Sequence, residues 1–347
     1  MNRSGLYVIV AVVAAMFAAV VVIVGIAFAV RMAWHSPPRH AIQPAVAPEI
    51  YDEQAALNAA ETIRPEMIGY EETSGFAVPF REPQALVVDD DDRIYVAGDQ
   101  AVAVFSPDGK KISQIALHDQ PHCLAVGGSQ HDKPGEIYVG MEEHVEVFDP
   151  KGTHVGTWPS QGEKAFFTGI TATDLGVWVA DAGNRVVWRY ESSGQALKPI
   201  GRTGDPECES EFVVTNHYFD LSAGHNDLVY VVNPRLLRVE GYTQRGELET
   251  FWGQGSPAVA DFFGCCNPAR LAVLPDGRFV TAEKGIPRVK IYSGRGEFET
   301  VVVGPPELTD TPGGVAGDHR GRILVLDARA AKVRIFQKKA DGKEKQP

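Results

Sequence analysis

Two of the four cysteines stand side by side, Cys265 and Cys266, in the stretch DFFGCCNPAR. A cysteine thiolate can bind a metal, exchange with a disulfide or become part of a structural bridge. Adjacent cysteines lack the C-x-x-C spacing of zinc and cluster sites. We expect a disulfide from Cys208 to Cys265 or Cys266. A vicinal Cys265–Cys266 disulfide, a metal site and free thiols remain alternatives.

Three other polar side chains have types suited to binding or catalysis, and each stands at the start of a short apolar stretch. They are His122 in PHCLAV, Asp220 in FDLSA and Arg270 in ARLAV. A carboxylate or an imidazole can bind a metal or transfer a proton, and a guanidinium binds anions. The sequence has no nucleophile elbow, Gly-rich phosphate loop or catalytic carboxylate pair. We therefore predict no particular reaction from these three residues.

A repeat in the sequence predicts how these residues are positioned. From residue 82 onward, one strand pattern recurs every 40 to 52 residues: IYVA at 94, IYVG at 137, VWVA at 177, VYVV at 229, FVTA at 279 and ILVL at 323. Another apolar strand precedes each copy, and a third strand and a polar Gly-containing turn follow most copies. Six units of this length indicate an all-β, six-bladed β-propeller. His122, Asp220 and Arg270 would then lie at the mouth of its central channel.

The segment from 65 to 80, PEMIGYEETSGFAVPF, has strand-like stretches, whereas the last unit has no obvious fourth strand. Pairing this segment into the last blade would cover an open sheet edge. We therefore predict that the propeller is closed by its N-terminal strand and spans residues 64–340, followed by a disordered tail at 341–347.

The N-terminal part predicts a membrane anchor. Residues 6–30 form a run of 25 uncharged, mostly apolar residues. As a helix this run is about 37 Å long, enough to cross a bilayer. The alternative is a cleaved signal peptide, since Ala27-Phe28-Ala29 resembles a cleavage site. We expect residues 1–30 to be an uncleaved anchor, residues 31–63 a Pro-rich linker, and the propeller to lie outside the cytoplasm.

The repeats resemble NHL repeats, in particular those of membrane-anchored bacterial propellers. The segment from Asp181 to Val186, DAGNRV, is close to the most recognisable phrase of that family, and the segment from Asp327 to Val333 is a weaker copy. The resemblance covers residues 82–340. It implies the propeller fold and says little about activity, because one fold hosts many functions.

Two groups of propeller enzymes show what the channel mouth can do. NHL-like amidating lyases hold a metal with histidines from several blades, and here only His122 occupies a comparable place. Gluconolactonase-like propellers hold a divalent ion with acidic and amide side chains, and Asp220 is one such candidate. Arg270, on the next blade, is expected to pair with Asp220. We expect no metal and no cofactor; the run Asp89–Asp92 is interpreted as a solvated turn, with a calcium site as the alternative.

The sequence favours binding over catalysis. A net charge of −12 argues against nucleic-acid binding. The long loops at 201–216 and 253–267 carry Phe212, Phe262 and Phe263, and Trp252 stands directly before the second loop. These four side chains bind a partner if exposed and cap the blade cores if buried. We expect a scaffold or sensor subunit that binds another envelope or membrane protein. The alternatives are a lactonase- or lyase-like enzyme with a divalent metal, and a docking accessory of a membrane electron-transfer complex.

Overall fold

The computed structural model describes residues 53–201 and 212–340. Within those two ranges, no helix is both long and apolar enough to cross a membrane. The predicted anchor at 6–30, most of the predicted linker and the predicted tail lie outside the described residues.

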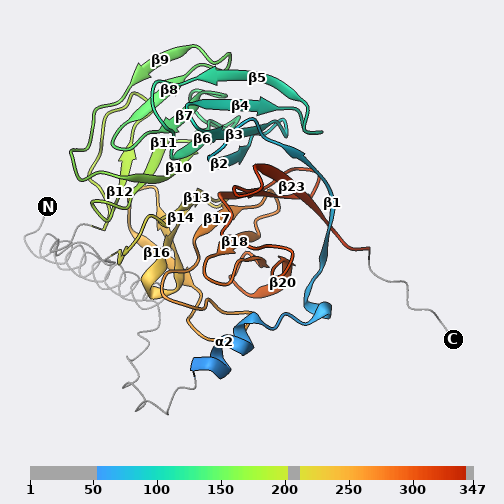
Figure 1. Ribbon diagram of the computed structural model, residues 1–347. Coiled ribbons are helices and arrows are strands. Elements are labelled where there is room, and N and C mark those ends of the chain that lie inside the picture. The colour runs from blue at the N-terminus through green and yellow to red at the C-terminus, as the bar shows by residue number, and fades with distance from the viewer. Residues whose placement is uncertain (1–52, 202–211, 341–347) are drawn as a thin grey trace, which may run out of the picture. The chain divides into compact units, whose positions relative to one another are not determined.

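Six β-sheets are arranged around a common axis, which confirms the six-bladed β-propeller (Figure 1). Blades 1, 2, 4 and 5 are β2–β5, β6–β9, β13–β16 and β17–β20; blade 3 is β10–β12, and blade 6 has the order β21-β22-β23-β1. The strands are β1 (Tyr70–Ala77), β2 (Pro83–Val88), β3 (Ile94–Gly98), β4 (Ala101–Phe105), β5 (Lys111–Ala116), β6 (Cys123–Val126), β7 (Ile137–Gly140), β8 (Val145–Phe148), β9 (His154–Thr157), β10 (Phe167–Thr173), β11 (Gly176–Asp181), β12 (Val186–Tyr190), β13 (Leu221–Ala223), β14 (Leu228–Asn233), β15 (Arg238–Thr243), β16 (Leu248–Trp252), β17 (Arg270–Val273), β18 (Phe279–Glu283), β19 (Arg288–Tyr292), β20 (Phe298–Val303), β21 (Gly314–Gly317), β22 (Ile323–Asp327) and β23 (Lys332–Lys338). Helix α2 (Glu53–Glu61) and two short 3-10 helices, η1 (Pro65–Met67) and η2 (Pro234–Leu236), complete the described elements.

The turns between the third and fourth strands follow the repeat. The glycines at the ends of SPDG, DPKG, ESSG, TQRG and SGRG all have φ between 79° and 88°: Gly109, Gly152, Gly194, Gly246 and Gly296. This left-handed region is accessible to glycine without a steric penalty. Blade 3 alone lacks a regular fourth strand, and isolated bridges from Val187 to Ile200 and from Tyr190 to Ala196 take its place.

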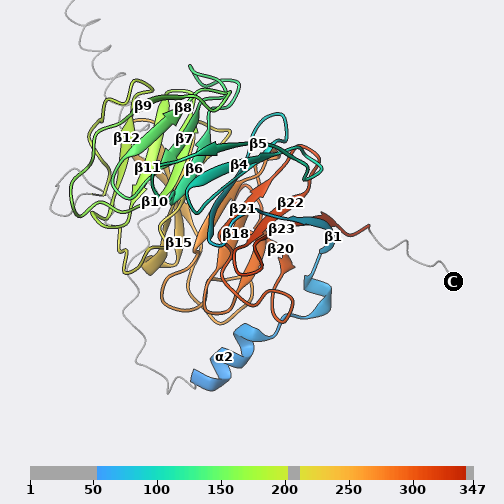
Figure 2. The same cartoon turned by 45° about the horizontal axis from the view of Figure 1, so that its top comes forward.

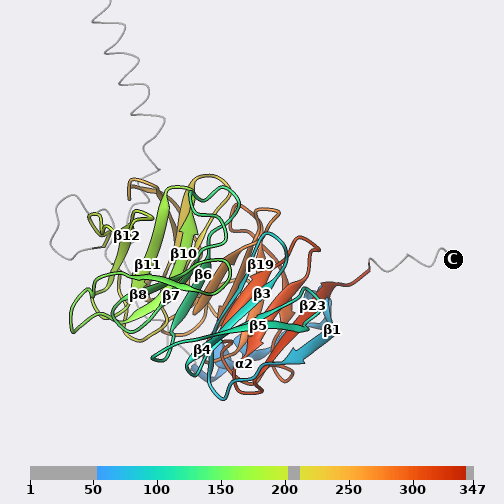
Figure 3. The ribbon, with the colours of Figure 1, turned by 90° about the horizontal axis from the view of Figure 1, so that it is seen from above.

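The innermost strands form a closed ring, in which each contacts the inner strand of the next blade. Figure 3 shows two of them, β6 and β10, side by side. The cores lie between blades: one buried cluster joins Val78 and Phe80 to Ile94 of blade 1 and to Leu326 and Val333 of blade 6. Because each blade covers one face of its neighbour, the ring must close before every core is complete.

The N-terminal strand closes the ring, as predicted. β1 pairs antiparallel with β23 through seven residue pairs, from Tyr70–Lys338 to Ala77–Lys332. Figures 1 and 2 both show β1 alongside β23, although the two strands are far apart in the sequence. The Glu72 carboxylate accepts hydrogen bonds from Arg334 at 2.7 Å and from Lys332 at 3.0 Å, which adds charge pairing to the main-chain ladder.

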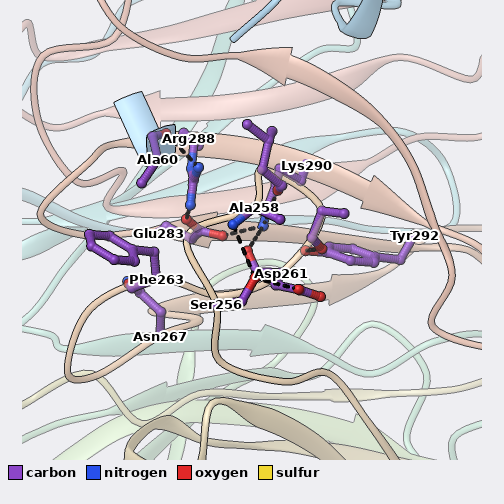
Figure 4. Close-up of polar contacts among 12 residues, drawn as sticks. Ala60, Ser256, Ala258, Asp261, Phe263, Asn267, Glu283, Arg288, Lys290 and Tyr292 are labelled. Carbon is purple, nitrogen blue, oxygen red and sulfur yellow. Dashed lines mark hydrogen bonds and ion pairs between the residues drawn. The ribbon is translucent and has the colours of Figure 1, made fainter. Parts of the chain in front are cut away.

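Blade 5 contains a buried charge network. The side chains of Glu283, Arg288 and Lys290 are at most 1% exposed, and both cations contact the Glu283 carboxylate (Figure 4). Arg288 also donates to the carbonyl of Ala60 in α2 at 2.9 Å, and Lys290 donates to the carbonyl of Asp261 at 2.7 Å. Burial lowers the pKa of Lys290 to about 8, although the Glu283 charge opposes this shift. The network therefore joins α2 and the loop before β17 to the blade.

Candidate functional site

Six equivalent positions form a ring at one end of the channel. They are Ala85, Cys123, Gly169, Asp220, Arg270 and Gly314. In each blade, the ring residue is paired through its main chain with the same position of the second strand. These partners are, in order, Ala97, Gly140, Ala180, Val232, Ala282 and Leu326. The repeat alignment made from the sequence is therefore correct at this ring. Four of the six side chains are small, and the channel has a volume of about 1640 Å³.

Asp220 is held by main-chain donors on two blades. Its Oδ1 accepts the N–H of Leu221 at 2.9 Å, and its Oδ2 accepts the N–H of Leu271 at 3.1 Å. A side chain at Gly169 would crowd it, because a Cβ there would lie 2.8 Å from Oδ1. Burial raises the pKa of Asp220, while the charge of Arg270 and the two N–H groups oppose the shift. Oδ2 thus joins the start of β13 to β17, whereas Oδ1 fixes the side chain to its own strand.

Arg270 reaches in a different direction from the one expected. Both Asp220 and Arg270 lie in the described part of the chain, and no ion pair joins them; Arg270 Nη1 instead donates to the carbonyl of Thr168 at 3.3 Å. The predicted Asp220–Arg270 pair is therefore wrong, because main-chain groups take up both side chains. Within the described residues, Arg270 Nε is buried and has no hydrogen-bond partner.

Replacing Asp220 by asparagine should destabilise the propeller. An amide has one acceptor oxygen, so its NH₂ group would face an N–H donor of Leu221 or Leu271. An unmatched buried donor costs about 1–3 kcal/mol. Urea unfolding of Asp220→Asn should show this loss, whereas Asp174→Asn, at an exposed position on the same channel, should change stability by less than about 0.5 kcal/mol. Equal stabilities would assign Asp220 to a bound ligand and not to the fold.

His122 is part of an aromatic stack just outside the ring. Its ring lies 4.8 Å from that of Phe166, and the Phe166 ring stacks on His217 at 4.1 Å. Burial lowers the pKa of His122; Glu142 opposes this shift and the charge of His217 adds to it. The phenyl ring between the two imidazoles holds them apart. His122 and His217 are therefore placed for stacking on flat groups.

Tyr218, next to His217 in the chain, lies close to two cations. The Lys284 ammonium lies 5.6 Å from the Tyr218 ring centre, and the Arg270 guanidinium lies 6.0 Å from it. Both contacts fall within the range of cation–π attraction. We call His122, Phe166, His217, Tyr218 and Lys284 the rim. All five are at least partly exposed.

Three rim residues were not found from the sequence, namely Phe166, Tyr218 and Lys284. A usable signal was present for two of them. Tyr218 stands two residues before the ring position of blade 4, and Phe166 stands three residues before that of blade 3.

Two of the aromatic residues expected to bind a partner are buried. Phe212 is 4% exposed and packs 5.0 Å from Phe219, and Phe262 is 0% exposed and packs 5.6 Å from Tyr292. Trp252 is partly buried against Phe279 and Tyr292. These three side chains cap the blade cores, so they cannot form the predicted exposed surface. Phe263 remains partly exposed.

The described cysteines Cys123, Cys265 and Cys266 are free thiols. Cys265 and Cys266 have their sulfurs 3.5 Å apart, so the alternative of a vicinal disulfide is not formed in this structure. The preferred bridge involves Cys208, which lies outside the described residues. Cys123 occupies the ring, and burial, together with the charge of Asp220, raises the pKa of its thiol.

The described residues do not fit the metal sites of amidating lyases or gluconolactonase-like propellers. Among them, no three His, Cys, Asp or Glu side chains converge. Asp220 uses both oxygens on main-chain donors, and its ring neighbours are mostly Ala, Gly or Cys. In the acidic run, Asp89 accepts hydrogen bonds from Arg93 and Tyr95, while Asp90 accepts the N–H of Ser129 in blade 2. These carboxylates therefore stabilise turns.

Solved structures with the same architecture include three lyase structures. A virginiamycin B lyase from Staphylococcus aureus superimposes with a TM-score of 0.53 at 13% identity, over 77% of this chain and 99% of that one. This chain shares the six-bladed fold of the virginiamycin B lyases. A streptogramin B lyase gives 0.52 at 14% identity (76% and 81% covered), and a Bacteroides thetaiotaomicron protein of unknown function gives 0.54 at 16% (76% and 72%). No family model and no curated protein matches the chain. At these identities the likeness is one of fold.

Proposed function

We propose that the chain is a scaffold or sensor subunit, anchored in the membrane by residues 6–30, whose propeller lies outside the cytoplasm. In this proposal the propeller binds another envelope or membrane protein through the rim. The observation that carries the proposal is the gathering of aromatic and cationic side chains at one channel mouth. Aromatic and arginine side chains contribute most of the binding energy at many protein interfaces.

The rim offers specific chemistry to a partner. The Lys284 ammonium and the Arg270 guanidinium both lie within 6.0 Å of the Tyr218 ring centre, and Lys284 is partly exposed. A carboxylate of the partner would pair with Lys284, and a flat side chain would stack against His122 or His217. We therefore propose an acidic, aromatic-containing segment as the bound element.

Because Phe212 and Phe262 are buried, we propose the rim as the interface in their place.

Rim substitutions should abolish partner binding without unfolding the propeller. Full-length protein would be extracted in mild detergent from its native membranes, and co-purifying proteins identified by mass spectrometry. Tyr218→Ala and Lys284→Glu should each reduce the recovered partner by about tenfold or more, the loss expected for a hot-spot residue. The matched control is Phe251→Ala, which removes an exposed aromatic on the outer strand β16. Partner recovery that responds to Phe251 and not to Tyr218 would place the interface elsewhere.

A further inference from the structure

The adjacent cysteines lie in a loop that is braced at both ends. Asn267, which is buried, donates through Nδ2 to the carbonyl of Phe263 at 2.5 Å and to that of Lys284 at 3.1 Å. Its Oδ1 accepts the N–H of Lys284 at 2.9 Å. Figure 4 shows Asn267 and Phe263 next to the buried network of blade 5. The turn from 263 to 267 is thus fixed to the end of β18, with both cysteines inside it.

The two sulfurs have unequal surroundings. Their Sγ atoms are 3.5 Å apart; Cys265 is exposed, whereas Cys266 is 2% exposed. Lys284 Nζ lies 3.9 Å from Cys265 Sγ, and Thr215 Oγ1 lies 3.0 Å from Cys266 Sγ. A reagent in solution can therefore reach the sulfur of Cys265 and not that of Cys266.

We propose that Cys265 and Cys266 form a thiol–disulfide exchange site whose substrate is an accessible disulfide. Cys265 is the attacking thiol, because it is exposed and a cation stands beside it. Cys266 is the resolving thiol, because it is buried and already in contact with Cys265. This inference does not depend on the proposed protein partner.

The reaction balances without another reagent. Cys265, as a thiolate, attacks one sulfur of the substrate disulfide; a Cys265–S–S–R bond forms, and the other half leaves as a thiolate. Cys266, as a thiolate, then attacks Cys265 Sγ and displaces the second half. The two leaving thiolates take up the two protons that the cysteines gave up. The cysteine pair is oxidised by two electrons to a vicinal disulfide, and the substrate is reduced to two thiols.

The product bridge is suited to reversal. A disulfide between adjacent residues deviates from relaxed disulfide geometry, and strained, exposed disulfides are reduced more readily than structural ones. Cys265 stays at the surface in either state, so a thiol can reopen the bridge. The site can therefore pass between two redox states at the channel mouth.

Exchange can be measured on the full-length protein in detergent. The reduced protein would be treated with glutathione disulfide, quenched with N-ethylmaleimide and digested with trypsin, which leaves both cysteines in the peptide 246–270. Wild type should yield this peptide unlabelled and two hydrogens lighter. Cys266→Ser should stop at a glutathione adduct on Cys265, accumulated about tenfold or more over wild type. Cys265→Ser should give neither product, and Cys208→Ser should behave as wild type.

Two outcomes of this exchange experiment would overturn the proposal. One is a link between peptide 246–270 and peptide 203–235, which contains Cys208, because the cysteines would then belong to a structural bridge. The other is a native Cys265 that glutathione disulfide leaves fully open to maleimide. The natural disulfide substrate can be identified by purifying the Cys266→Ser protein from its own membranes. A protein attached to Cys265 indicates that the substrate is a protein disulfide, and a small adduct indicates a small-molecule disulfide. Free Cys265 in that protein would also contradict the proposal.

Discussion

A chain that begins at residue 82 will not form a stable propeller, whereas one that begins at residue 53 will. The shorter chain lacks β1, so β23 keeps an unpaired edge along seven residue pairs. It also loses the buried side chains of Tyr70, Val78 and Phe80. Burial of each is worth about 1.5–3 kcal/mol, and the sum approaches the about 5–15 kcal/mol that stabilises a whole domain.

The two truncated proteins can be compared by urea unfolding followed by tryptophan fluorescence. We expect a cooperative transition for the chain from residue 53 and none for the chain from residue 82. Tyr70→Ala in the full chain should lower the unfolding free energy by about 3 kcal/mol or more. Its neighbour Glu71 is exposed, and Glu71→Ala should have little effect. Similar transitions for both truncated proteins would show that β1 is dispensable.

Replacing Glu283 by glutamine should be among the most damaging single changes. Glu283 is the carboxylate that both Arg288 and Lys290 contact, and all three side chains are almost fully buried. Glutamine keeps the shape and removes the negative charge, so two buried cations are left uncompensated. Breaking a buried pair in this way costs about 3–5 kcal/mol. We expect a loss of that size in the unfolding free energy.

Two further variants separate charge from shape. Glu299→Gln breaks an exposed ion pair with Arg278 and should cost less than about 1 kcal/mol. Adding Lys290→Met to Glu283→Gln removes one uncompensated cation, so the double variant should recover part of the lost stability. A double variant less stable than Glu283→Gln alone would mean that Lys290 acts through its bonds to the carbonyls of Val259 and Asp261.

The fold could be predicted because its signals are local and repeated. The six second strands, the turn glycines and the ring positions follow a period that is visible in the sequence. The closing strand was predictable because the last unit lacks a fourth strand. Blade 3 deviates: its fourth strand is reduced to isolated bridges at Ala196 and Ile200, and Pro199, which has no N–H to donate, stands between them.

The site was harder to predict because it depends on the orientations of side chains, which the sequence does not specify. Asp220 and Arg270 were correctly placed at neighbouring ring positions, yet each bonds to the main chain and not to the other. The aromatic residues Phe212 and Phe262 could equally cap a core or face solvent, and packing decided for the core. The approach of Lys284 to Tyr218 joins blade 5 to blade 4, and only the folded ring brings them together.

The most direct test of the scaffold proposal is site-specific photo-crosslinking in native membranes. The photoreactive residue benzoylphenylalanine would replace His217, the exposed rim residue beside Tyr218, in the full-length protein, and Phe251 in a matched control on the outer strand of the same blade. We predict one prominent crosslinked protein from position 217 and none from position 251. A stable, membrane-localised protein that gives no adduct at 217, or the same adduct at both positions, would contradict partner binding at the rim.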